Sequence, residues 1–187
     1  MANVCIIEPY CGGSHRAWLD GLTQHSRHDI TTLTLPAQFW KWRMQGGAVA
    51  LAIQYKKSYL KPDVIIASEM MDLSIFRTLT RKTTSNIPIG IYFHENQLTY
   101  PQGSRQEHGW RYGFINYASM LSADRIFFNS QYHLESFFEE LRRMLKHFGD
   151  TNELQMVDIL RERSSVLSVG VALRRFDRHA DQKKASK

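Results

Sequence analysis

Short apolar, β-branched runs alternate with segments of helical periodicity along the chain. The apolar runs predict six strands, at residues 3–10, 30–35, 63–68, 87–93, 124–130 and 165–171. The helical patterns predict helices near residues 15–25, 38–57, 71–82 and 107–122, then one that ends at about 148 and one at 150–162. Near-continuous apolar strands separated by helices are typical of a parallel sheet covered on both faces. We therefore expect a doubly wound, Rossmann-like α/β fold of about six strands.

The segments that follow four of these strands are polar or rich in glycine. They are "CGGSH" after the first strand, "SEMMD" after the third, "HENQ" after the fourth and "NSQYH" after the fifth. Ligands of such sheets bind outside the carboxyl ends of the strands. We expect these segments to meet there at one rim.

The fourth strand ends on "FHENQ", which makes His94 the sharpest candidate. An imidazole at this place can act as a general base, accept a proton or bind a sugar hydroxyl. A surface or hydrogen-bonded histidine is the structural alternative. Glu95 could orient His94 or bind a substrate hydroxyl, and a salt-bridged rim carboxylate explains it equally well. His15 could add a second polar group from the glycine loop.

Gly12 and Gly13 remove side chains where the first strand turns into a helix. Backbone N–H groups at the helix N-terminus could then approach a phosphate, or the glycines could serve only a tight turn. Ser14 could cap the first helix, a role that competes with ligand contact. Asn129 and Ser130 could likewise be a helix cap or ligand contacts.

Aromatic and basic residues interleave in "FWKWR", at Trp40, Lys41, Trp42 and Arg43. Such groups suit stacking on bases and contact with phosphates. A helix that packs one tryptophan inward and leaves the other in solvent explains the pattern as well. Arg105 and Arg111, in and after the polar loop that follows residue 99, are further candidates for an anionic partner.

Length and composition bound these hypotheses. With 187 residues, 43% of them hydrophobic, the chain can bury the core of one domain. Cys5 and Cys11 are too few for a disulfide framework or a zinc cage, and we expect no metal. The sequence has neither a membrane-length apolar run nor a signal-peptide pattern, so we expect a soluble, cytoplasmic protein with no membrane partner.

The net charge of +6 does not by itself indicate a nucleic-acid partner. Residues 174–187 carry six Lys or Arg and two Asp, a net of +4. Subtracting +4 from +6 leaves only +2 for residues 1–173. A basic tail is more often a solvated end than a binding arm.

The segments "GGSH", "LPAQFWKWR", "YFHENQLTYP" and "FFNSQYHLESF" together resemble one family. It is the N-terminal domain of the tRNA-queuosine mannosyltransferases, also called glycosyltransferase-like domain-containing proteins, within the retaining GT-B glycosyltransferases. The resemblance runs from residue 2 to about 176. It implies a two-domain enzyme with two facing Rossmann-like halves and catalysis in the cleft between them.

The resemblance also implies roles for the two halves and for individual residues. The N-terminal half holds the acceptor, expected to be queuosine in a tRNA anticodon, and the other half holds a nucleotide sugar, expected to be GDP-mannose, with no further cofactor. His94, with Glu95 beside it, matches the active-site histidine motif. The glycine loop, Gly12, Gly13 and Ser14, is expected at the donor phosphates. The remaining expected contacts are His15, Asn96, Gln97, Asn129 and Ser130 for substrate, and Trp40, Lys41, Trp42, Arg43, Arg105 and Arg111 for nucleic acid.

The expected organisation is an acceptor-side domain at residues 1–173 and a basic tail at residues 174–187. "SVGVALRRFD" resembles the family's crossover to the second domain, so we expect the donor domain to be absent and the chain to be inactive alone. It is either a truncated enzyme or a half-enzyme with a separate partner. Two other classes stay open: a non-catalytic RNA-binding module, and a small-ligand Rossmann-like domain.

Overall fold

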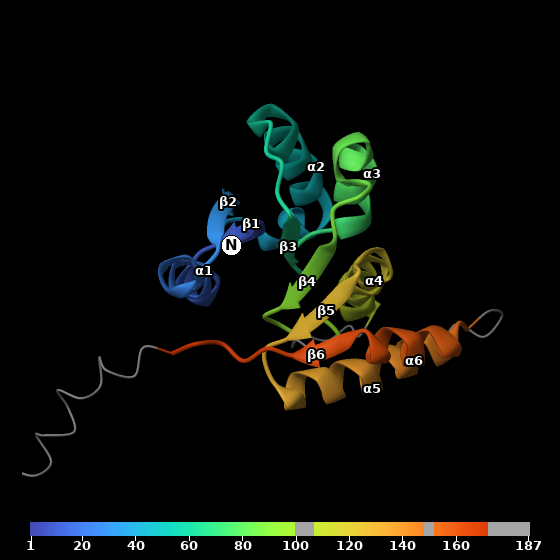
Figure 1. Ribbon diagram of the computed structural model, residues 1–187. Helices are drawn as coiled ribbons and strands as arrows, with labels where there is room; N and C mark the ends of the chain where they lie inside the picture. The colour runs from blue at the N-terminus through green and yellow to red at the C-terminus, as the bar shows by residue number, and fades with distance from the viewer. Residues whose placement is uncertain (100–106, 148–151, 172–187) are drawn as a thin grey trace, which may run out of the picture.

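The computed structural model describes residues 1–99, 107–147 and 152–171 and confirms the doubly wound α/β fold (Figure 1). The strands are β1 (Asn3–Cys11), β2 (Asp29–Pro36), β3 (Val64–Ser68), β4 (Ile89–Phe93), β5 (Arg125–Phe128) and β6 (Ser164–Val166). The helices are α1 (Gly13–His25), α2 (Trp40–Ser58), α3 (Leu73–Thr84), α4 (Glu107–Ser122), α5 (Gln131–His147) and α6 (Leu154–Glu162). All strand pairs are parallel, in the order β2-β1-β3-β4-β5-β6.

Side chains of each strand alternate between two apolar layers, as a sheet covered on both faces requires. In β1, Cys5 and Ile7 point into the larger layer, which α2 to α6 cover. Val4 and Ile6 point into the smaller layer, where Trp18 of α1 packs. Figure 1 shows α1 on one side of the sheet and α2, α3 and α4 on the other.

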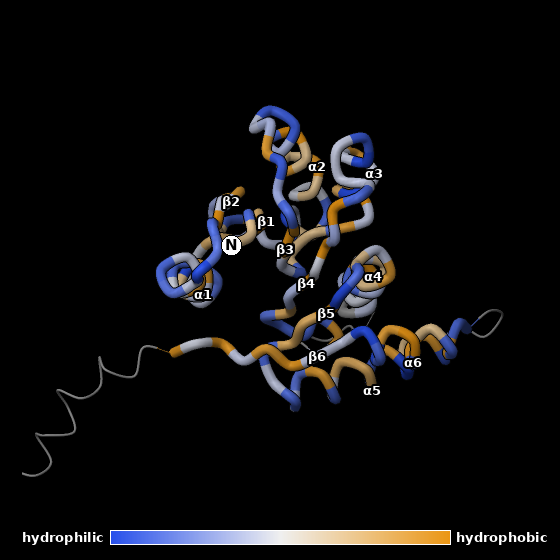
Figure 2. Tube along the Cα trace, viewed as in Figure 1, coloured by the Kyte–Doolittle hydropathy of each residue, from blue (hydrophilic) through white to orange (hydrophobic). Residues whose placement is uncertain are grey.

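The last strand is shorter than the sequence predicted. We expected a strand at 165–171, but pairing with β5 ends at Val166, opposite Phe128. Figure 2 shows that apolar residues continue beyond β6, and Leu167 and Val171 are half exposed. The run is apolar, but β5 ends at Phe128 and offers no further partner. The preceding helix is also shorter than predicted, since it begins at Leu154 rather than at 150.

The strand order places a crevice at the carboxyl ends of β1 and β3. From β1 the chain first adds β2 on one side and then returns to add β3 on the other. The connections after β1 and β3 therefore leave the sheet in opposite directions, which opens a crevice between them. The polar segments predicted for the rim follow β1, β3 and the neighbouring β4 and β5.

No described helix is both long and apolar enough to cross a bilayer. The basic tail at 174–187, for which the sequence predicted a crossover role, lies outside the described residues, as does Arg105.

Candidate functional site

Three buried polar side chains meet where β1, α1 and β4 come together, and we call Glu8, His15 and His94 the histidine cluster. Glu8 lies in the last part of β1, His15 in the first turn of α1, and His94 directly after β4. The side chain of His94 is 6% exposed and that of Glu8 is fully buried. The prediction that these strand ends converge on one rim is confirmed.

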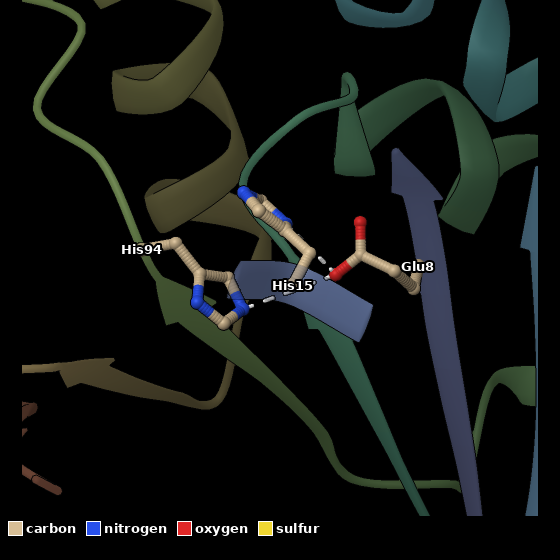
Figure 3. Close-up of side chains that lie close together, drawn as sticks. All are labelled: Glu8, His15 and His94. Atoms are coloured by element: carbon tan, nitrogen blue, oxygen red, sulfur yellow. Dashed lines mark hydrogen bonds and ion pairs between the residues drawn. The ribbon is translucent and has the colours of Figure 1, made fainter. Parts of the chain in front are cut away.

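The two imidazoles of the histidine cluster approach the same carboxylate oxygen (Figure 3). His15 Nδ1 lies 3.1 Å from Glu8 Oε2, and His94 Nε2 lies 3.9 Å from that atom. The rings of His15 and His94 are 4.1 Å apart between centroids. Only the first distance is that of a hydrogen bond. His15 is therefore held by Glu8, while Nε2 of His94 is buried without a hydrogen-bond partner.

The surroundings separate the protonation states of the two histidines. Burial acts to lower the pKa of His15, but the hydrogen bond to Glu8 and the charges of Glu69, Glu8 and Glu95 together raise it to about 9. Burial and the positive charge of His15 lower the pKa of His94 to about 3. At neutral pH a protonated His15 thus lies against a neutral His94, with the two rings tilted by 36°.

A second buried carboxyl, Glu69, follows β3 beside the histidine cluster. Its Oε1 accepts a hydrogen bond of 2.8 Å from the backbone N–H of Glu95, and its Oε2 is buried without a partner. Burial raises the pKa of Glu69 to about 7, against the opposing charge of His15. Glu69 therefore fixes the loop after β4 and can hold a proton near neutral pH.

The histidine cluster also offers atoms that could bind a metal ion. One ligand atom each of Glu8, His15 and His94 lies within 4.8 Å of the other two, and zinc accepts this set of residue types. Metal binding requires the ligating imidazole nitrogens to be deprotonated. The hydrogen bond from His15 to Glu8 and the raised pKa of His15 describe the alternative, in which a proton lies between these two groups.

The glycine loop stands at the N-terminus of α1, next to the histidine cluster. Gly13 has φ +52°, a conformation that favours glycine, with open space around the place of a Cβ. Gly12 is extended, but a Cβ there would lie 2.4 Å from Cβ of Ala37. Gly12 is the helix cap residue and provides no side-chain cap, so a capping role for Ser14 is wrong. The first N–H groups of the helix remain available to an anion.

Three other polar residues of "HENQ" and "NSQYH" use their side chains to hold the backbone or a neighbouring side chain. Asn129 Nδ2 donates to the carbonyl of His94 at 2.8 Å, which fixes the loop behind the imidazole. Ser130 Oγ accepts from the N–H of His133, so the alternative of a helix cap is confirmed for Ser130. Asn96 Nδ2 donates to Ser136 Oγ at 3.2 Å, away from the cluster.

Glu95 and Gln97 face a second hollow, which we call the aromatic recess. Its lining is Tyr10, Trp40, Met70, Glu95 and Gln97, and it encloses about 90 Å³. Gln97 Nε2 lies 3.4 Å from Glu95 Oε2. The carboxylate that approaches the ring of His94 is that of Glu8, so among the described residues Glu8 takes the orienting position that the sequence offered to Glu95. The alternative of a salt-bridged Glu95 stays open, because the loop that carries Arg105 lies outside the described residues.

One tryptophan of "FWKWR" packs inward and the other faces solvent, as the structural alternative for this segment predicted. Trp40 packs on Tyr112, with ring centroids 5.1 Å apart, whereas Trp42 is 63% exposed. Phe39 is 78% exposed. We call Phe39–Arg43 together with Arg111 the aromatic-basic rim. Lys41 and Arg111 are exposed there, Arg43 donates to the carbonyl of Pro36, and Arg111 to Gln45.

Sequence reasoning missed Glu8 and Glu69 as site residues. Each follows an apolar strand core, in "CIIEPY" and "IIASEM", where a carboxyl is easily taken for the end of a strand. The signal that could have found them is their position, since the carboxyl ends of β1 and β3 flank the crevice.

Comparison with known proteins finds matches over almost the whole chain. The chain matches the family model described as tRNA-queuosine alpha-mannosyltransferase N-terminal over residues 3–171. It is 31% identical over 175 residues to the tRNA-queuosine alpha-mannosyltransferase of Drosophila melanogaster. The matched region is 93% of this chain and 46% of that relative. The chain thus spans about half the length of that curated relative.

Proposed function

Because the chain belongs to the N-terminal domain family of the tRNA-queuosine alpha-mannosyltransferases, we propose that it is the acceptor-side half of a glycosyltransferase. The proposed enzyme transfers mannose from a nucleotide sugar, GDP-mannose, to queuosine in tRNA. Donor binding falls mainly to a second, C-terminal Rossmann-like half, as in the GT-B arrangement. The donor is a substrate, and the proposal includes no further cofactor. A tRNA acceptor fits a cytoplasmic enzyme.

The observation that supports catalysis most directly is the histidine cluster. Retaining glycosyl transfer develops positive charge on the sugar and negative charge on the leaving diphosphate. A neutral imidazole at His94, with its buried Nε2 unpartnered, can hydrogen-bond a hydroxyl of the sugar or of the acceptor. Groups fixed beside the reacting atoms stabilise these charges without the reorganisation that water requires.

His15 and the glycine loop suit the leaving diphosphate. His15 is protonated at neutral pH, and its Nε2–H is buried without a partner. The uncapped N-terminus of α1 adds backbone N–H groups on the same side of the cluster. A cation and a helix N-terminus both favour an anion. The diphosphate would therefore lie against the start of α1 when the donor half closes over it.

The aromatic-basic rim suits the tRNA. Exposed aromatic rings offer stacking surfaces to unpaired bases, and the cations contact phosphates. Replacing Lys41, Arg43 and Arg111 by alanine should weaken tRNA binding and flatten its dependence on salt. The matched control replaces Lys56, Lys57 and Lys82, exposed cations in the last turns of α2 and α3. Equal affinity and salt slope in the two triple variants would remove the rim from the proposal.

The function itself is tested by mass spectrometry of tRNA nucleosides from cells with and without the gene. We expect mannosylated queuosine to disappear with the gene and to return when the gene is restored. Unchanged mannosyl-queuosine would refute the acceptor and the sugar together. A non-catalytic RNA-binding module would leave the nucleosides unchanged but still bind tRNA.

A further inference from the structure

The aromatic recess combines aromatic walls with a carboxylate and an amide, a lining that the transfer of mannose alone does not require. Two aromatic side chains, Tyr10 at the end of β1 and Trp40 at the start of α2, line it together with Met70. Its polar groups are the carboxylate of Glu95 and the amide of Gln97. Apolar and aromatic walls with a few convergent polar groups are typical of a ligand pocket.

The polar groups of the recess favour a ligand that carries hydrogen-bond donors. Gln97 is 1% exposed, and its Oε1 is buried without a partner. Its Nε2 is already directed toward Glu95 Oε2 and the sulfur of Met70, so the free position is an acceptor. Glu95 adds the acceptor oxygens of its carboxylate to the same lining. An anionic ligand such as a phosphate is therefore disfavoured, whereas a cation with N–H or O–H donors is favoured.

The recess lies next to the proposed reaction site. The ring of Tyr10, in its lining, is 6.0 Å from that of His15, edge to face, and the ring of His15 is 4.1 Å from that of His94. On the opposite side, Trp40 begins the aromatic-basic rim, with Lys41 Nζ 5.7 Å from its ring centroid. A group in the recess thus lies between the surface proposed for tRNA and the histidine that faces the reacting hydroxyl.

We infer that the aromatic recess binds the cationic arm of the acceptor base and so sets the specificity for queuosine over guanosine. Queuosine differs from guanosine by an aminomethyl arm that carries a cyclopentene diol, and its secondary amine is protonated at neutral pH. The ammonium lies against Glu95 and the aromatic rings, which attract a cation. A donor of the arm satisfies Gln97 Oε1, and the diol reaches toward His94. This inference rests on the proposed function, since it assumes a queuosine acceptor.

The test compares two anticodon stem-loop RNAs of identical sequence, one with queuosine and one with guanosine at the modified position. Their dissociation constants are measured with the purified protein by fluorescence anisotropy. We expect the queuosine RNA to bind the wild type at least tenfold more tightly. Glu95→Gln should reduce this preference about tenfold, since hydrogen bonds to charged groups are the strong ones, and leave the guanosine RNA unaffected. Gln97→Met, which keeps the volume, should reduce the preference severalfold.

The control is Glu139→Gln, which removes an exposed carboxylate on α5 and should leave both constants unchanged. Circular dichroism shows that each variant is folded. If the wild type prefers queuosine and both recess variants keep that preference, the inference is overturned while the acceptor role stands. If the wild type binds both RNAs equally, the acceptor role fails and the inference with it. If a recess variant weakens the binding of both RNAs by the same factor, the inference is also overturned, because the residue then contacts a part that the two RNAs share.

Discussion

The two ends of the parallel strands carry polar residues that behave in opposite ways. At the amino ends, Asp63 Oδ2 accepts from the N–H of Asn3 at 2.7 Å, and Asp124 Oδ2 accepts from the N–H of Ile89 at 2.8 Å. Each aspartate directly precedes one strand and holds the start of the neighbouring strand. These carboxylates use their hydrogen-bonding capacity on the backbone of the sheet.

At the carboxyl ends, buried polar atoms are left without partners. They include His15 Nε2, Glu69 Oε2, His94 Nε2 and Gln97 Oε1, together with Ser68 Oγ at the end of β3. A buried polar atom without a partner costs about 1–3 kcal/mol, so folding alone gives no reason for a group of them. Arg163 Nε, just before β6, is also unpartnered, but Nη1 of the same side chain donates to the carbonyl of Ala123. The gathering of unpartnered atoms at the carboxyl ends indicates that these ends serve a ligand, whereas the aspartates at the amino ends serve the stability of the sheet.

The largest effect expected from this comparison is on turnover at His94. In the two-domain enzyme that we propose, His94→Ala should lower mannosyl transfer by about 10²-fold or more, the scale for losing a positioned catalytic group. The melting temperature should fall by only a few degrees, because Nε2 has no hydrogen bond to lose and only the contacts of the buried ring with His15, Trp18 and Tyr92 are removed. Transfer is measured with queuosine-containing tRNA, and melting by circular dichroism.

The volume-preserving His94→Gln and the exposed His25→Ala serve as controls for this experiment. His94→Gln should also be slow if the imidazole itself matters, whereas His25→Ala should transfer at the normal rate. Full activity combined with a clear loss of stability in both His94 variants would place this residue with the structural groups of the amino ends.

The second effect is a pH dependence of stability that originates at His15. Because the pKa of His15 is raised from 6.5 to about 9 in the folded protein, its stabilising contribution is complete below pH 6.5 and is lost as the pH rises through 9. We expect a loss on the order of 2 kcal/mol across this range. The free energy of unfolding of the wild type should exceed that of His15→Gln at pH 6.5, and the two should converge as the pH rises above 9.

Urea titrations at several pH values measure this difference, and subtraction of the variant removes the contribution of groups that do not interact with His15. Glu69, whose pKa burial raises to about 7 against the lowering effect of the charge of His15, is part of the difference and is replaced by glutamine in both proteins to isolate His15. Cys5 and Tyr92, whose pKa values burial raises to about 12, lose their protons in the folded state only above this range. His25→Gln, at the other end of α1, should show no convergence with pH. A constant difference between wild type and His15→Gln would exclude the proton that we place between His15 and Glu8.

The sequence predicted the fold well because the apolar runs are long and local. Five strands lie within two residues of their predicted bounds at each end, and "HENQ" was placed at the correct edge of the sheet. The prediction for the sixth strand was too long, because the length of β6 depends on where its neighbour β5 ends, and that is set by the tertiary structure. His94 could be singled out by its position after a buried strand. The contact of His94 with Glu8 could not be predicted, because it joins two residues that are far apart in the sequence and meet only when the sheet forms.

The third effect concerns the amino ends, where removal of a carboxylate should cost stability without changing chemistry. Asp63→Ala should lower the free energy of unfolding by about 1–2 kcal/mol, since it leaves the N–H of Asn3 without its acceptor. Asp20→Ala, which removes an exposed ion pair with Arg16 on α1, should cost about 0.5 kcal/mol or less. Equal losses in urea titrations of the two variants would show that Asp63 is only a surface charge.

The smallest effect is at Gly13, where the requirements of fold and ligand can be separated. Alanine would meet no atom within 4 Å there, so its cost comes from the backbone at φ +52° and should be about 1 kcal/mol. Gly21→Ala, in the middle of α1 and equally free of contacts, should instead stabilise the protein by about 0.5–1 kcal/mol. Because the new methyl at position 13 stands at the uncapped start of α1, we expect it to raise KM for the nucleotide sugar severalfold, whereas Gly21→Ala leaves KM unchanged. Steady-state kinetics beside urea titrations distinguish the two roles: a loss of stability with an unaltered KM would assign Gly13 to the turn alone and move the diphosphate away from this helix.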